Sequence, residues 1–105
     1  ISKHTTLLEG TIVMHSAIIN AGSSIGENCI INTQALIEHG AVVESHCHIS
    51  TGAKVNGEAF IGKGSFVGSG TVIHEGVKIG EKCVIAAGSI IRKDMPLGTF
   101  YLSDS

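Results

Sequence analysis

Three histidines stand within ten residues of one another in the stretch IEHGAVVESHCHIS, residues 37–50. They are His39, His46 and His48. An imidazole can act as a general base, bind a metal ion or simply lie on a surface. The choice depends on which structural elements hold these side chains and on which of them face the same way.

The positioning elements show themselves in a sequence period of six. Every sixth residue from Ile1 is aliphatic: Ile1, Leu7, Val13, Ile19, Ile25, Ile31, Ile37, Val43, Ile49, Val55, Ile61, Val67, Ile73, Ile79, Ile85, Ile91 and Leu97. Two residues before each, from Thr5 to Ser89, the side chain is Thr, Ala, Ser, Cys or Val, and Met95 is the first exception. A large and a small residue with one residue between them form the alternation of a short, half-buried strand.

Glycine marks the turns between these strands. Thirteen of the 14 glycines fall in two phases of the period, one containing Gly22 and Gly40 and the other containing Gly26, Gly62 and Gly98. Glycine accepts turn conformations that other residues resist. Strands alternating with turns, with no room for a helix, predict an all-β parallel solenoid.

The composition limits the classes of function. The 105 residues predict one domain, 1–105, and a formal charge of −2 without a basic stripe argues against nucleic acid as a partner. No apolar run has transmembrane length, which argues against membrane insertion. Cys29, Cys47 and Cys83 all occupy the small inward phase, so we expect packed, reduced thiols and a cytoplasmic location.

The hexads GSSIGE, EAFIGK, GSFVGS and GVKIGE resemble the hexapeptide repeat of left-handed parallel β-helix acyltransferases. The resemblance covers nearly the whole chain. It implies triangular coils of 18 residues and a left-handed helix of five to six coils.

Residues 18 apart should then stack at about 4.8 Å. The outward columns are Ile12, Ile30, His48, Phe66 and Val84; Ile18, Leu36, Lys54, Val72 and Ile90; and Ser24, Val42, Phe60, Lys78 and Pro96. Two of these columns are largely apolar, which favours burial in a symmetric oligomer. Members of the family are commonly homotrimers.

Stacking also gives His39 its surroundings. Its column runs Lys3, Ala21, His39, Gly57, Glu75 and Lys93, and Gly57 is the one glycine outside both turn phases. A base beside a gap and an open backbone N–H suits acyl transfer. His48 lies half a coil away on another face, so the two histidines should meet only between chains.

Residues 31–73 look most like bacterial sialic acid O-acetyltransferases and N-acetyltransferases of nucleotide-linked 4-amino sugars. The shared features are Asn32-Thr33, Glu38-His39, His48, Ser50, the segment 52–54 and Gly57. The resemblance implies transfer from acetyl-coenzyme A to an amine or hydroxyl of a nucleotide-linked sugar in bacterial surface glycan synthesis. It assigns catalysis to Glu38, His39 and Gly57, and coenzyme binding to His48, Asn32, Ser69 and Ala87.

The sequence departs from that family at two points. Relatives usually carry Asp or Glu directly after the catalytic histidine, where this chain has Gly40; Glu58, one coil above Gly40, is a possible substitute. Relatives also have an N-terminal domain that binds the nucleotide sugar, which residues 1–105 lack. Because Ile1 is already in phase, we expect the chain to be the C-terminal half of such a protein.

Two alternatives remain open. A zinc site like that of β-helical carbonic anhydrases needs three convergent imidazoles, and no two of the six histidines are 18 or 36 residues apart; we therefore expect no metal. A solenoid that serves only as an interaction module is the other alternative, and the phase break at Gly57 weighs against it.

Overall fold

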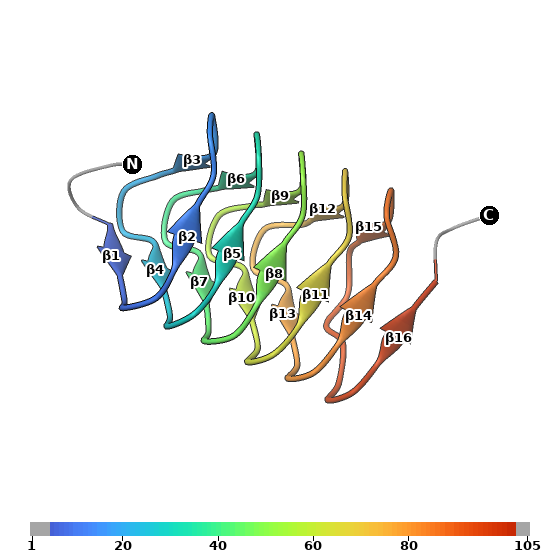
Figure 1. Cartoon of the computed structure of the whole chain (residues 1–105). Coiled ribbons are helices and arrows are strands. Elements are labelled where there is room, and N and C mark those ends of the chain that lie inside the picture. The colour runs from blue at the N-terminus through green and yellow to red at the C-terminus, as the bar shows by residue number, and fades with distance from the viewer. Residues whose placement is uncertain (1–4, 103–105) are drawn as a thin grey trace.

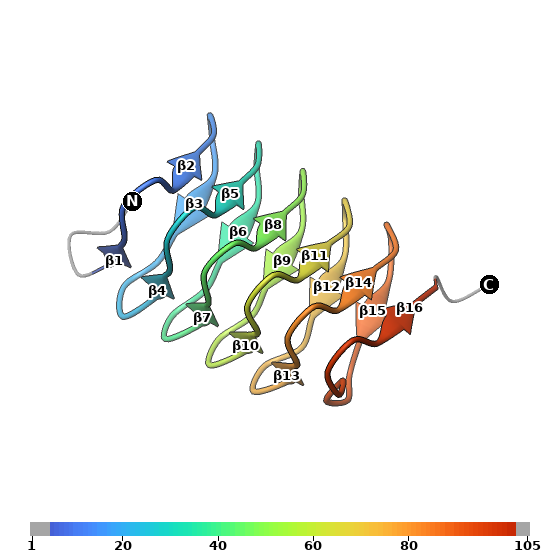
Figure 2. The same ribbon diagram turned by 60° about the horizontal axis from the view of Figure 1, so that its bottom comes forward.

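The protein forms a triangular prism of stacked coils, seen from two sides in Figures 1 and 2 of a computed structural model that describes residues 5–102. Three parallel sheets make the sides of the prism, which measures 37 × 22 × 22 Å. Ile1, Lys3 and His4 lie outside the described residues. The all-β, left-handed β-helix predicted from the hexads is confirmed.

Each strand has two residues, and the three sheets take strands in turn. Sheet A contains β1 (Thr6–Leu7), β4 (Ser24–Ile25), β7 (Val42–Val43), β10 (Phe60–Ile61) and β13 (Lys78–Ile79). Sheet B contains β2 (Ile12–Val13), β5 (Ile30–Ile31), β8 (His48–Ile49), β11 (Phe66–Val67), β14 (Val84–Ile85) and β16 (Phe100–Tyr101). Sheet C contains β3 (Ile18–Ile19), β6 (Leu36–Ile37), β9 (Lys54–Val55), β12 (Val72–Ile73) and β15 (Ile90–Ile91).

The core is the column of large aliphatic side chains predicted from the period. From Ile19 to Ile91 each of these residues is buried, and the small residues two positions earlier fill the corners. Cys29, Cys47 and Cys83 are buried and free, as predicted from their phase. Contact with the Cys29 thiol, together with burial, raises the pKa of Cys47.

Every turn uses one left-handed residue, and the sequence reveals only some of them. The glycines of the first phase have φ between +69° and +80°, as at Gly40 (+71°). Six other turns place a residue with a side chain there: Ser16, Asn28, Gln34, His46, Glu58 and Lys82. The second phase has another cause: a Cβ at Gly68 would lie 2.5 Å from the backbone nitrogen of Ala87. Glycine is needed there because adjacent coils approach closely.

The last coil is two residues shorter than the others. Ile79 pairs with Met95 and Ile85 with Tyr101, a separation of 16 residues in place of 18. The predicted inward position of Leu97 is therefore wrong, since its side chain is 70% exposed and Met95 takes its place in the core.

The same shift corrects two further expectations. Pro96 does not stack on Lys78; the Asp94 carboxylate accepts a 2.8 Å hydrogen bond from the Lys78 backbone N–H there. Gly98 belongs to the left-handed turn positions, with φ of +73°.

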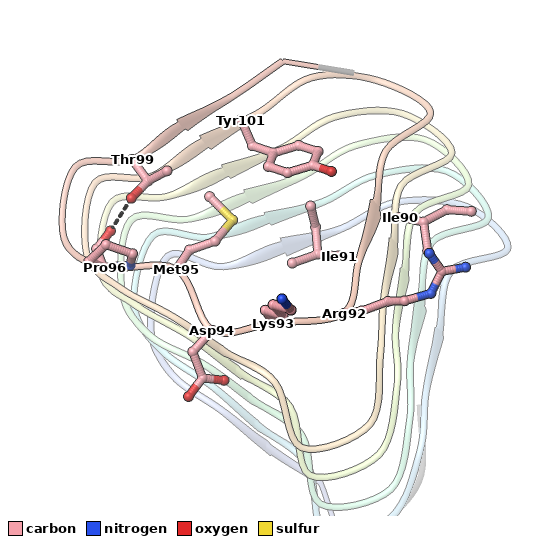
Figure 3. Close-up of a pocket in the computed structure, with 9 residues that line it drawn as sticks. All are labelled: Ile90, Ile91, Arg92, Lys93, Asp94, Met95, Pro96, Thr99 and Tyr101. Atoms are coloured by element: carbon pink, nitrogen blue, oxygen red, sulfur yellow. Dashed lines mark hydrogen bonds between the residues drawn. The ribbon is translucent and has the colours of Figure 1, made fainter. Parts of the chain in front are cut away.

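The open C-terminal end holds the largest cavity of the described residues, about 460 Å³. Figure 3 shows Ile91, Met95 and Tyr101 pointing into the lumen and Asp94 pointing away from it. Met95 and Tyr101 thus help to close the end as predicted, whereas Leu97 and Phe100 do not. Phe100 is 71% exposed and pairs with Val84, so it extends the apolar column of sheet B.

Candidate functional site

His39 lies on the corner of the prism where sheet C passes into sheet A, which we call the His39 corner. The turn after β6 contains Glu38, His39 and Gly40, and the corresponding turn one coil later contains Asn56, Gly57 and Glu58. Each turn closes with an N–H bonded to the carbonyl three residues earlier, as from Ala59 to Asn56 at 3.2 Å. Its two central residues therefore project from the corner.

The predicted gap beside His39 exists. Glu38, His39, Asn56, Gly57 and Glu75 line a shallow cavity of about 340 Å³. The structure therefore brings all three residues expected for catalysis, Glu38, His39 and Gly57, to one place. It adds Asn56 and Glu75, which stack on Glu38 and Gly57 at the 18-residue spacing and could have been found by extending those columns.

Gly57 leaves both space and a hydrogen-bond donor. A Cβ built on it would meet only the His39 carbonyl oxygen, at 3.3 Å. That carbonyl accepts the Glu58 N–H at 3.1 Å, while the Gly57 carbonyl accepts the Gly76 N–H at 3.0 Å. The Gly57 N–H itself has no acceptor among the described residues, so it is available to a ligand.

The free N–H is a general property of this turn position, which the sequence argument did not foresee. In other turns a side chain covers it: Ser45 Oγ accepts from Glu27 N–H at 3.0 Å, and Glu44 Oε1 accepts from Lys63 N–H at 3.2 Å. Gly57 is distinct because it carries no side chain of its own. Its N–H is therefore accessible from the cavity.

The carboxylates near His39 are held in different ways. Asn20 donates a 2.6 Å hydrogen bond to Glu38 Oε1, so Glu38 leans toward the preceding coil. The Glu58 carboxylate lies directly against Gly40, as its stacking suggested. Neither carboxylate forms a hydrogen bond with the His39 imidazole in the described part of the chain. The ring instead packs beside Gly22, where a Cβ would lie 3.4 Å from His39 Cε1.

The residues expected to bind the coenzyme lie on another part of the prism. Asn32, Ser69 and Ala87 lie on the corner between sheets B and C, in two adjacent columns. Asn32 Oδ1 accepts a 2.9 Å hydrogen bond from the Thr33 N–H. A Cβ added at Gly70 or Gly88, beside Ser69 and Ala87, would meet nothing within 4 Å. This corner is thus an open lane of small residues along the prism axis.

His48 lies on sheet B, next to that lane. It stands between Ile30 and Phe66 on the outer face, and its ring lies 5.1 Å from the Phe66 ring at an angle of 51°. Sheet B is the side of the triangle opposite the His39 corner. One chain therefore does not bring His39 and His48 together.

No metal centre is formed by the described residues: within 5–102 there is no group of three or more His, Cys, Asp or Glu side chains that could hold an ion. The same residues contain no helix long and apolar enough to cross a bilayer.

Comparison with known proteins agrees with the fold. A family model described as bacterial transferase hexapeptide (six repeats) matches residues 58–93. The chain is similar to the acetyltransferase domain of PglB from Neisseria gonorrhoeae in complex with acetyl coenzyme A, with 31% identity and a TM-score of 0.93, covering 94% of this chain and 48% of that one. The same domain without the coenzyme gives 30% identity and a TM-score of 0.87, covering 93% and 51%.

A third similar structure is a histidine-to-asparagine variant of perosamine N-acetyltransferase from Caulobacter crescentus, in complex with CoA and GDP-perosamine. It shares 26% identity at a TM-score of 0.82 and covers 95% of this chain and 50% of that one. The chain thus spans about half the length of each of these structures. No curated protein sequence matches it.

Proposed function

We propose that this chain, a β-helix of bacterial transferase hexapeptide repeats, is the catalytic part of an acetyl-coenzyme A-dependent sugar acetyltransferase. The observation that carries the proposal is the likeness, over 94% of the chain, to an acetyltransferase domain with acetyl coenzyme A bound. The cavity that joins His39 to the free N–H of Gly57 supplies a fitting site. The acceptor is the amine or hydroxyl of a nucleotide-linked sugar used in bacterial surface glycan synthesis.

His39 acts as the general base, with Gly57 as the oxyanion donor. His39 removes a proton from the acceptor as the acceptor's lone pair forms a bond to the acetyl carbonyl carbon. The carbonyl electron pair moves onto oxygen, where the Gly57 N–H donates a hydrogen bond. The C–S bond then breaks, and the imidazolium returns its proton to the departing coenzyme sulfur. Base catalysis of this kind contributes roughly 10²–10⁴ in rate.

No covalent enzyme intermediate is involved. The only thiols of the chain are buried in the lumen of the prism, where they donate to backbone carbonyls, as Cys47 Sγ does to Gly62 O at 3.1 Å. Direct transfer between two bound substrates therefore suits the structure. Glu38, fixed by Asn20, lines the cavity next to His39 and adds negative charge that favours the imidazolium.

The complete site lies between two chains of a homotrimer. Sheets B and C carry exposed apolar columns, including Ile12 and Ile18, which are 54% and 55% exposed. If sheet C of one chain packs on sheet B of the next, the His39 corner meets strand β8. His39 and His48 of the partner subunit then lie at nearly the same height, because they are half a coil apart along the axis.

Coenzyme binding follows from the same packing. The pantetheine arm lies along the lane formed by Asn32, Ser69 and Ala87, and His48 contacts the coenzyme near the thioester. Acetyl-coenzyme A as cosubstrate and three unpaired thiols suit the cytoplasm as the location.

Calorimetric titration of acetyl-coenzyme A into the chain tests this function, with light scattering to measure the oligomeric state. We expect a trimer that binds the coenzyme, and a His48→Ala variant that remains trimeric but binds it at least about tenfold more weakly. His46→Asn is the matched control: it lies two residues away on the opposite corner, at a φ of +64° that asparagine accepts. A folded trimer without affinity for the coenzyme would leave only the interaction module.

A further inference from the structure

The cavity beside His39 carries an uncompensated negative charge. Two of its five lining residues, Glu38 and Glu75, are carboxylates, and none is Lys or Arg. Glu38 already accepts a hydrogen bond from Asn20, at 2.6 Å. The Glu75 side chain has no hydrogen-bond or ion-pair partner within residues 5–102. Its full charge is therefore available to whatever enters the cavity.

Glu75 faces His39 across Gly57. The three residues occupy the same turn position in successive coils, in the turns after β6, β9 and β12. With about 4.8 Å between coils, roughly 10 Å separates the backbones of His39 and Glu75. Because Gly57 has no side chain, the two residues border a single gap. A group held in that gap lies between an imidazole and a carboxylate.

The other nearby carboxylate does not compete for this role. Glu58 belongs to the same corner, but its carboxylate lies against Gly40, on the side of the preceding coil. It is not among the residues that line the cavity. Glu75 is thus the carboxylate whose position opposite the base is unclaimed by another contact.

We propose that Glu75 determines acceptor specificity by holding the ammonium form of a primary amine in the gap opposite His39. This inference rests on the proposed acetyltransferase function and narrows its acceptor to an amino sugar. A hydrogen bond between an ammonium and a carboxylate is charge-assisted and about twice as strong as a neutral one. A sugar hydroxyl carries no charge and gains only the neutral bond.

The chemistry balances for an amine that arrives protonated. The ammonium first loses one proton to solvent, which frees its lone pair while Glu75 keeps the nitrogen in place. The nitrogen bonds to the acetyl carbon, and its second proton passes to His39 and then to the coenzyme sulfur as the C–S bond breaks. The products are the amide, the free coenzyme thiol and one proton. During attack the nitrogen becomes positive, and the Glu75 carboxylate stabilises that charge.

Kinetics with paired acceptors tests the proposal. The acceptors are GDP-perosamine and the same nucleotide sugar with a hydroxyl in place of the amine, and the variant is Glu75→Gln. We expect kcat/KM for the amine to fall about tenfold or more, mainly through KM, and the preference for amine over hydroxyl to fall by the same factor. KM for acetyl-coenzyme A should not change, and Glu75→Asp should recover part of the preference.

Glu81→Gln is the matched control. Glu81 occupies the same turn position in the next turn along the chain, on a different corner, so its replacement removes the same charge far from His39. It should leave both acceptors unaffected. An unchanged amine preference in Glu75→Gln, or an equal loss in Glu81→Gln, would overturn the proposal.

A binding measurement separates this inference from the proposed function. The Gly57 amide resonance is followed by NMR during titration with glucosamine and, separately, with glucose. Wild type and Glu81→Gln should bind the amine at least about fivefold more tightly, and Glu75→Gln should bind both sugars equally. Equal binding by wild type, or no shift at all, overturns the role of Glu75. Failure to bind acetyl-coenzyme A, with amine selectivity intact, overturns the acetyltransferase function alone.

Discussion

Replacing Gly57 by alanine separates the chemistry of the His39 corner from its folding. The backbone of Gly57 is not in the left-handed region, so alanine adopts its conformation without strain. A Cβ there meets one atom, the His39 carbonyl oxygen, at 3.3 Å, a contact relieved by a shift of a few tenths of an ångström. The stabilisation from a less flexible unfolded chain, about 0.4–1 kcal/mol, roughly offsets that crowding. We expect the free energy of unfolding to change by less than about 1 kcal/mol.

Activity should change far more than stability. The methyl group of Gly57→Ala occupies the space from which an acetyl carbonyl reaches the Gly57 N–H. Loss of one oxyanion donor costs other enzymes about 10²–10³ in rate, or about 2.7–4 kcal/mol. We therefore expect kcat/KM to fall at least about 100-fold, while the melting temperature moves by less than about 8 °C.

Gly64→Ala provides the opposite pattern. Gly64 has a φ of +74° on another corner, and a Cβ there would approach only the side chain of Lys82, at 3.6 Å. Alanine in that conformation costs about 1–2 kcal/mol, so this variant should melt earlier and keep its activity. Thermal melts and steady-state kinetics on both variants suffice. Wild-type activity in Gly57→Ala would refute the role of the Gly57 N–H.

Three more predictions follow from the site and the core. His39→Gln should lower kcat by roughly 10²–10⁴ and leave the calorimetric affinity for acetyl-coenzyme A unchanged; a loss of affinity instead would make His39 a binding residue. Gly68→Ala should lower the melting temperature more than any substitution at an open turn, because its Cβ would lie 2.5 Å from Ala87 N; an unchanged melt would mean that the coils separate easily. Iodoacetamide should leave the native thiols unmodified by mass spectrometry and label all three after denaturation, because Cys29 and Cys47 are buried and the pKa of Cys47 is raised; rapid native labelling would show that the coils open.

Most of the fold follows from the sequence because one physical rule repeats. Each hexad buries one large and one small side chain, so the strand positions from Ile12 to Ile91 were predictable to the residue. The shortened last coil was not, because Leu97 continues the aliphatic phase by coincidence while its strand has moved. Met95, too large for the small phase, was the available signal. The bond from Lys78 N–H to the Asp94 carboxylate shows how the corner closes with two residues fewer.

The site was predictable only where it follows the same stacking. His39 and Gly57 share a cavity because they are 18 residues apart, and Glu75 joins them by the same arithmetic. The lean of each side chain depends on its local contacts, such as that of Glu38 with Asn20, and no period encodes these. The relation between His39 and His48 depends on how chains pack, which a repeat within one chain does not specify.

The core of the prism counts in sixes, whereas its surface counts in eighteens. Inserting six residues in a turn would leave every buried contact satisfied, yet it would rotate all later residues by one face. The interior is therefore indifferent to an error that would move Glu75 away from His39 to another corner. Inserting 18 residues beyond Glu75 would lengthen the prism and leave the cavity untouched. Selection on the surface, and not on the stability of the core, must therefore keep the number of hexads between His39 and Glu75 fixed.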